Sequence, residues 1–529
     1  MLQLFKKLLL RLVSQLQRNR LNAAMTISAV PNINVKATIT MLKVSTIIII
    51  NILAYNLKSM LFKDYLPYYK RNLKVALPVM LTQLGASLVG LFDSIMVGHY
   101  ATVDLAAVSF SNAIFFTVMV FAMGALMGLT PLVGIQVGSL SSNITSNGEH
   151  CEQSDSPLAS SPRSLISSLF QNGMLFTVLL SIFTLVLLGG CIPFLHCFGQ
   201  DSAVVEAARP YYILIVISII PFLFFTFFKQ FLEGLGNTSV AMVITLLMNG
   251  LNIFLNWLFI YGNWGCPELG ATGAGVGSLV ARVGMPICFV AVMYYRKEWK
   301  GYLKAMRVAN FRKSVIKELA KIGFPIGVQT LMETIAFTAA FVFIGWISKE
   351  DLAAHQIANQ ICDMTFMVIL GIGSATTIRV SHQLGAKNLE GVRMASNASI
   401  HLVLLINAIG AAVMIGFRNY IPLLFTKDPE VIAIASQLVV LAGVLQLADG
   451  LQVVAASMLR GITDVKVPMI IAMFSYTIVC ISIGLFLAFP MGMGAVGIWI
   501  GFVVGLSVAA VCLHTRFRIK FRDLELQIG

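Results

Sequence analysis

The chain has 529 residues, of which 58% are hydrophobic and only 11% are charged, and its mean hydropathy of +0.86 lies far above that of an ordinary soluble domain. The formal net charge of +14 does not indicate nucleic-acid binding, because Lys and Arg gather in short segments between apolar runs, as they do in membrane proteins. The composition therefore predicts an all-α integral membrane protein, and the lack of strand-like alternation argues against a β-barrel.

Twelve apolar stretches are long enough to cross a bilayer as helices. In chain order we expect spans at residues 72–97, 104–137, 164–190, 205–232, 239–261, 271–295, 322–347, 352–383, 395–417, 430–459, 467–489 and 493–515. The segment after the sixth span is dense in Lys and Arg, whereas the turns that follow the fifth and eleventh spans carry neither. The positive-inside rule then places the even-numbered loops and both termini in the cytoplasm.

Three segments lie outside the predicted spans. Residues 1–65 begin with a basic amphipathic stretch, for which we expect a surface helix or a dispensable extension. Residues 139–163 are polar and rich in Ser, which predicts a flexible cytoplasmic loop. Residues 518–529 form the predicted cytoplasmic tail.

An internal repeat organises the spans. A displacement of 247 residues aligns the chain with itself without a gap from Leu77 to Gly138, and it superimposes polar and turn residues that hydropathy alone would not align. The aligned pairs include Pro78 with Pro325, Asp104 with Asp351, Asn112 with Asn359 and Gln136 with Gln383.

Each half of the repeat holds six spans. We expect an N-lobe at residues 66–295 and a C-lobe at 322–517, joined by a basic cytoplasmic linker at 296–321. An even number of spans in each half makes the two bundles parallel repeats. Transporters of this design bind substrate between the bundles and rock one bundle against the other.

Three acids inside the predicted spans are the main candidates for ion coupling, and the repeat duplicates neither Asp93 nor Glu333. Asp93 aligns with Ala340 and Glu333 aligns with Ala86, while Asp449 lies deep in the tenth span. An ionised carboxylate inside a bilayer costs at least about 2.5 kcal/mol, so it is protonated, paired with a cation or exposed to a water-filled cavity. Each state suits an acid that exchanges a proton or a monovalent cation during transport. A structural hydrogen bond between helices is the alternative.

Other polar residues in the spans allow weaker predictions. Asn252 and Asn256 share one helix face at i and i+4, and together with Asp93 they form a candidate cation site. Asp363 aligns with Phe116 and is either an accessory acid or a bond between helices.

Basic residues and enzyme motifs add little to the candidate site. We expect Lys229, Arg282 and Arg379 to lie near cytoplasmic helix ends and to snorkel. The sequence contains no GxxxxGK[ST], Ser-His-Asp or HExxH pattern, so we expect no enzyme, no ATP drive and no cofactor.

Several motifs together resemble one known family. They are GLFDSIMVG, LNIFLNWLFIYG, METIAF, DLAAHQIANQ, SATTIRVSHQLGAKN and ADGLQVVAASMLRGITD. They resemble the multidrug and toxic compound extrusion (MATE) family in its bacterial NorM branch, over about residues 66–517. The resemblance implies two six-helix lobes, a V-shaped cavity, and export of cationic, amphipathic drugs in exchange for Na⁺ or H⁺.

The resemblance also implies roles for individual residues. Asp93, Asn252 and Asn256 match the family's N-lobe site, and Glu333 and Asp449 match the C-lobe acids, so Na⁺ would bind at one of these two sets. NorM relatives with a Na⁺ site carry a tyrosine four residues before the second C-lobe acid, and here that position is Leu445.

We therefore expect a monomeric antiporter of the bacterial inner membrane whose coupling ion is Na⁺ or H⁺ and whose cargo is small organic cations. Its partners would be the cargo and the lipid bilayer, with no nucleic acid. The alternative is a flippase for lipids or lipid-linked oligosaccharides, which would place basic residues along its cavity.

Overall fold

The computed structural model describes residues 65–146, 162–304 and 311–528. The predicted surface helix near the N-terminus and most of the Ser-rich loop lie outside these residues. The helices longer than one turn are α3 (Leu66–Tyr100), α4 (Thr102–Leu126), α5 (Leu129–Ser146), α6 (Pro162–Gly190), the 3₁₀ helix η2 (Ile192–Phe198), α7 (Ser202–Ile217), α8 (Ile219–Gly234), α9 (Ser239–Tyr261), α10 (Ala271–Tyr295), α11 (Lys297–Lys304), α12 (Lys313–Gly345), α13 (Lys349–Gly385), α14 (Leu389–Gly416), α15 (Pro429–Gly461), α16 (Lys466–Met473), the π-helical turn η6 (Phe474–Cys480), α17 (Ile481–Ala488) and α18 (Gly494–Ile528).

Within the described residues, twelve helical segments are long and apolar enough to cross a membrane. This confirms the predicted number of spans and the all-helical fold class. The helices are longer than their apolar stretches: α12 begins at Lys313, inside the predicted linker, and α18 continues to Ile528. Hydropathy marks only the part of a helix that meets lipid, whereas its polar ends continue into the interface.

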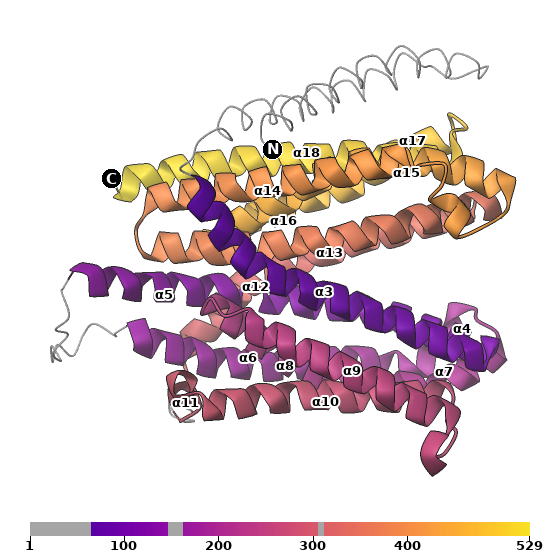
Figure 1. Ribbon diagram of the computed structural model, residues 1–529, viewed down its shortest axis with the longest axis horizontal. Coiled ribbons are helices and arrows are strands. Elements are labelled where there is room, and N and C mark those ends of the chain that lie inside the picture. The colour runs from indigo at the N-terminus through magenta and orange to yellow at the C-terminus, as the bar shows by residue number, and fades with distance from the viewer. Residues whose placement is uncertain (1–64, 147–161, 305–310, 529) are drawn as a thin grey trace.

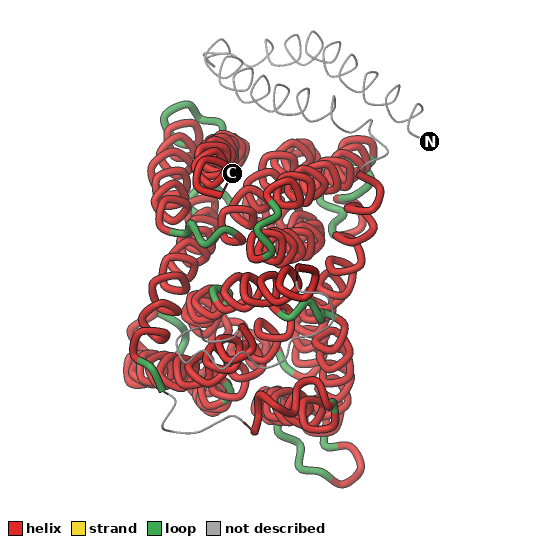
Figure 2. The backbone as a smooth tube through the Cα atoms, turned by 90° about the vertical axis from the view of Figure 1, so that its left-hand side faces the viewer, coloured by secondary structure: helices red, strands yellow, loops and turns green. Residues whose placement is uncertain are grey.

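The helices form two groups, which Figure 2 shows from one end. The later part of α3 packs with α4–α10 in one group, which we call the N-lobe, and the later part of α12 packs with α13–α18 in the other, the C-lobe (Figure 1). The long helices α3 and α12 begin against the opposite lobe. Asn72 of α3 donates to Ser399 of α14 at 2.9 Å, and the backbone N–H of Arg312, which precedes α12, donates to Asn172 of α6 at 2.7 Å.

The aligned aspartates of the repeat have the same structural task in each lobe. The backbone N–H of Ala271, the first residue of α10, donates to Asp104 Oδ2 at 2.7 Å. The N–H of Ala495 in α18 donates to Asp351 Oδ1 at 3.1 Å. Each carboxylate therefore satisfies an N–H that the start of its lobe's last helix leaves free, and the helix dipole favours its charge.

The two lobes meet backbone to backbone at one end of the molecule. A Cβ atom on Gly138 of α5 would overlap the carbonyl oxygen of His382, and one on Gly385 of α13 would overlap that of Ile135. The repeat exchanges these two contacts, since residue 135 aligns with 382 and 138 with 385. His382 Nε2 also lies 2.8 Å from the carbonyl oxygen of Gly234 in the N-lobe.

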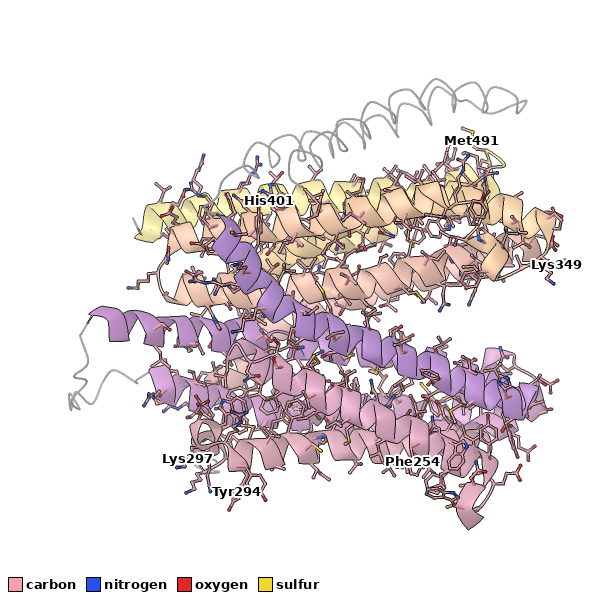
Figure 3. The ribbon with its side chains drawn as sticks, in the orientation of Figure 1. Phe254, Tyr294, Lys297, Lys349, His401 and Met491 are labelled. Carbon is pink, nitrogen blue, oxygen red and sulfur yellow. The ribbon has the colours of Figure 1, made fainter. Side chains whose placement is uncertain are left out.

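We call this end of the molecule the linker end, because α11 lies there. Figure 3 places Lys297 of α11 toward one end of the long axis and Lys349, the first residue of α13, at the other. Toward the Lys349 end, α3 and α13 draw apart (Figure 1). The contacts between lobes are thus concentrated where the odd-numbered spans begin and the even-numbered spans end.

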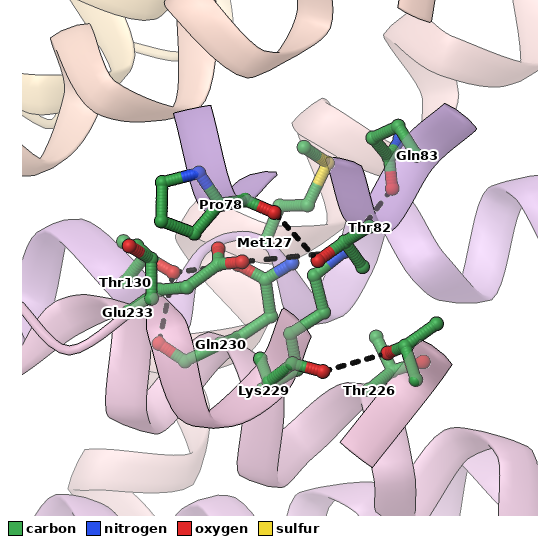
Figure 4. Close-up of polar contacts among 12 residues, drawn as sticks. Pro78, Thr82, Gln83, Met127, Thr130, Thr226, Lys229, Gln230 and Glu233 are labelled. Carbon is green, nitrogen blue, oxygen red and sulfur yellow. Dashed lines mark hydrogen bonds and ion pairs between the residues drawn. The ribbon is translucent and has the colours of Figure 1, made fainter. Parts of the chain in front are cut away.

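Lys229 does not snorkel, so that prediction is wrong. Its side chain is buried in the N-lobe, with Nζ 3.2 Å from Gln83 Oε1 and 4.0 Å from Glu233 Oε1 (Figure 4). Beside it, the Thr130 hydroxyl donates to Gln230. The last turns of α8 lie inside the bundle rather than at its lipid surface, which gives the ammonium group protein partners.

Candidate functional site

The N-lobe site is built around Asp93, where α3 packs against α9. Asn256 Nδ2 donates to Asp93 Oδ1 at 2.5 Å. We assign the Asn252 amide the orientation that satisfies both of its ends: its nitrogen donates to Asp93 Oδ1 at 3.0 Å, and its oxygen accepts from Ser278 Oγ at 3.3 Å. The structure thus brings together the three residues that the sequence proposed, because the i, i+4 spacing presents both amides to one carboxylate.

One oxygen of this cluster has no hydrogen-bond partner. Asn256 is fully buried, and its Oδ1 accepts no bond. It lies against Gly277 of α10, where a Cβ atom would overlap it. A carboxylate and amide oxygens are ligands that hard cations prefer, and the same oxygens can share a proton. The cluster can therefore hold either Na⁺ or H⁺.

Arg282 lies in the middle of α10, so the expectation that it snorkels is wrong. Its Nη1 donates to Ser218 Oγ at 2.7 Å, at the interruption between α7 and α8. The guanidinium carbon lies 4.9 Å from the ring centroid of Phe115 and 5.4 Å from that of Phe222. Asp93 is close enough to interact with this cation electrostatically. The polar partner at this depth is Ser218, between α7 and α8, which the sequence of α10 alone does not indicate.

The C-lobe site contains Glu333 of α12 and Asp449 of α15. The Tyr476 hydroxyl donates to Glu333 Oε1 at 3.0 Å. Tyr476 is fully buried and belongs to the π-helical turn η6. A π-helical turn shifts the direction of the side chains within it and is frequent at functional sites. Because of this turn, the span that contains Tyr476, which has no acidic residue of its own, directs a hydroxyl at Glu333.

Asp449 and Glu333 approach each other without a shared hydrogen bond. Asp449 is 9% exposed, and its Oδ1 accepts no hydrogen bond. The Asp449 carboxyl interacts electrostatically with Glu333. Arg460 interacts electrostatically with Glu333, and its Nη1 lies 3.8 Å from Met127 Sδ in the N-lobe. The acid pair is thus linked through one arginine to the contact between the lobes.

Asp363 lies apart from the other acids. It is exposed on α13, and Asn359 of the same helix donates to its Oδ2 at 3.1 Å. No hydrogen bond in the described part of the chain joins it to Glu333 or Asp449. Among the described residues, no group of three or more His, Cys, Asp or Glu side chains could hold a metal ion. The accessory role of Asp363 stays a prediction.

Sequence reasoning missed two members of these clusters, Tyr476 and Ser278. Each is a polar side chain inside a strongly apolar span, and that signal could have drawn attention to both. Their partners could not be found in this way, because Tyr476 bonds across 143 residues of sequence and Ser278 across 26.

A sequence model of the MatE family matches residues 78–143, 161–258 and 325–486, which is more than half of the chain. The chain belongs to the MatE family. The resemblance drawn from its motifs is thereby confirmed. The candidate residues all lie within the matched segments: Asp93, Asn252, Asn256, Glu333 and Asp449.

Curated relatives of this MatE protein cover nearly its whole helical part. It is 33% identical to the probable multidrug resistance protein NorM of Rhizobium meliloti, over 85% of this chain and 93% of the relative. It is 30% identical to the multidrug resistance protein MdtK of Pectobacterium atrosepticum, over 88% of this chain and 98% of that one.

Solved structures share the fold. A MATE crystal structure in the straight conformation superimposes with a TM-score of 0.75 at 20% identity, over 87% of this chain and 97% of that one. The outward-facing conformation of a multidrug resistance MATE family transporter gives a TM-score of 0.74 at 20% identity, with the same coverage. This MatE protein is therefore a multi-pass membrane protein with two six-helix lobes.

Proposed function

We propose that this MatE protein is a cation-coupled multidrug efflux antiporter that exports small, amphipathic organic cations in exchange for Na⁺ or H⁺. One observation carries the proposal: each lobe holds acids inside a span with polar partners, the partly buried Asp93 in the N-lobe and the partly buried Glu333 with the buried Asp449 in the C-lobe. The names of the relatives as multidrug resistance proteins support the cargo class.

In the proposed cycle, the acids of the two lobes bind cargo and coupling cation in turn. A carboxylate that attracts an organic cation loses that attraction once a proton or Na⁺ occupies it. The bound coupling cation therefore releases the cargo, and the next cargo molecule displaces the coupling cation. An ion gradient can drive the cycle only if the acids face the two sides of the membrane alternately.

The contacts between the lobes support an outward-facing resting state. Gly138 and Gly385 close the lobes at the linker end, while α3 and α13 separate toward the other end (Figure 1). The basic linker favours a cytoplasmic position for that closed end, and with it both termini. We place the protein in a bacterial inner membrane, where it acts as a monomer.

The test is efflux from proteoliposomes loaded with ethidium, under an imposed Na⁺ gradient in one arm and a pH gradient in the other. Asp93→Asn or Glu333→Gln should abolish gradient-driven efflux while the protein still inserts and keeps its melting temperature. The matched control is Asp201→Asn, which changes an exposed acid that caps α7. Undiminished efflux by both acid variants would overturn the proposal, and the more effective gradient identifies the ion.

A further inference from the structure

Arg282 is a partly buried cation in the middle of a span, and the proposed cycle does not use it. Within the described residues, no carboxylate lies within the 4.0 Å that would make an ion pair with it, whereas Lys229 and Arg516 each have an acid partner. A charge in the middle of a span is costly, and one that persists there usually serves the transport path. Within the described part of the chain, the guanidinium donates to the neutral hydroxyl of Ser218.

Three side chains hold the guanidinium of Arg282 in place. Ser218 directs its own proton to the carbonyl oxygen of Ile215 at 2.7 Å, so its lone pairs are free to accept from Arg282. The rings of Phe115 on α4 and Phe222 on α8 offer their faces to the cation. This arrangement keeps the charge away from Asp93 instead of joining it in an ion pair.

The face of α10 that carries Arg282 is nevertheless connected to Asp93 by hydrogen bonds. Ser278 lies one turn before Arg282, its hydroxyl bonds the Asn252 amide, and that amide bonds Asp93. The charged or titratable groups that interact with the guanidinium are Asp93 from α3 and Tyr211 from α7, and Tyr211 donates its hydroxyl proton to Asn112 as a neutral phenol. The positive charge of Arg282 thus offsets the negative charge of Asp93 whenever that carboxyl is ionised.

We propose that Arg282 is a positioning residue of the transport cycle: a fixed positive charge, held back by Ser218 and two phenylalanine rings, that weakens cation binding at Asp93 enough for the cation to leave. A transport site must bind its ion well enough to load and weakly enough to unload. For a unit charge about 10 Å from a cation site, an effective dielectric constant of about 20 corresponds to a change in cation affinity of about tenfold. The inference rests on the proposed function.

The first test measures tetraphenylphosphonium binding to the full chain in nanodiscs, in choline chloride buffer. Arg282→Met should tighten binding by about tenfold, and Arg282→Lys, which keeps the charge, should restore the wild-type dissociation constant. Ser218→Ala releases the guanidinium toward Asp93 and should weaken binding. The matched control is Lys229→Met, which removes a buried cation of the same lobe that already has Glu233 as its partner.

The second test separates binding from release in ethidium efflux. Arg282→Met should lower both KM and the maximal rate, because a cation held more tightly leaves more slowly. A purely structural role would lower the melting temperature of Arg282→Met and leave the dissociation constants of all folded variants equal, which would overturn the inference. Wild-type protein without gradient-driven efflux would instead overturn the proposed function.

Discussion

Gly277→Ala perturbs the N-lobe site without changing any of its polar side chains. The new methyl group would overlap Asn256 Oδ1, so the amide has to move away from Asp93 and its 2.5 Å hydrogen bond is lost. A hydrogen bond to a charged group contributes about 1.5–3 kcal/mol, and about 1.4 kcal/mol corresponds to a tenfold change in an equilibrium constant. We expect ion-driven efflux to fall by about tenfold to a hundredfold.

Gly284→Ala is the matched control for this prediction. It adds the same methyl group to the same helix two turns later, where the new atom would meet only Met248 Sδ, at 2.8 Å, the movable end of a flexible side chain. Efflux of ethidium from proteoliposomes and the melting temperature would be measured for both variants. If Gly277→Ala folds and transports as the wild type does, Asn256 has no part in coupling and the argument for the N-lobe site fails.

Three further outcomes are expected. Tyr476→Phe removes the hydroxyl that donates to Glu333, and ion-driven efflux should fall by about tenfold or more with the fold intact; equal efflux would show that Tyr476 has no part in the site. Gly385→Ala forces the lobes apart at the linker end, so cysteine labels across that end should move apart in distance measurements by electron paramagnetic resonance; unchanged distances would contradict the closure. Asp104→Ala removes the acceptor of the α10 N-terminus and should cost about 1 kcal/mol of stability, read as a lower melting temperature, while Asp351→Ala should do the same in the other lobe.

Local chemistry was sufficient to predict the spans and the N-lobe cluster. A helix in lipid satisfies its own backbone, so each span could be recognised from its own residues. The amides of Asn252 and Asn256 share a helix face because of their i, i+4 spacing. Both donate to Asp93, the acid that the repeat aligns with Ala340. The parallel arrangement of the lobes followed from the even number of spans in each half.

Contacts between distant segments were decided only by the tertiary structure. The π-helical turn that points Tyr476 at Glu333 has no signature in hydropathy, and the place of Arg282 depends on where α7 and α8 are interrupted. The closure of the lobes at Gly138 and Gly385 depends on how two bundles approach each other. Sequence periodicity shows which side chains lie on one face of a helix, whereas the packing of helices decides which neighbouring side chains they contact. In this protein, packing decides the partners of Glu333 and Arg282, the charges on which transport would depend.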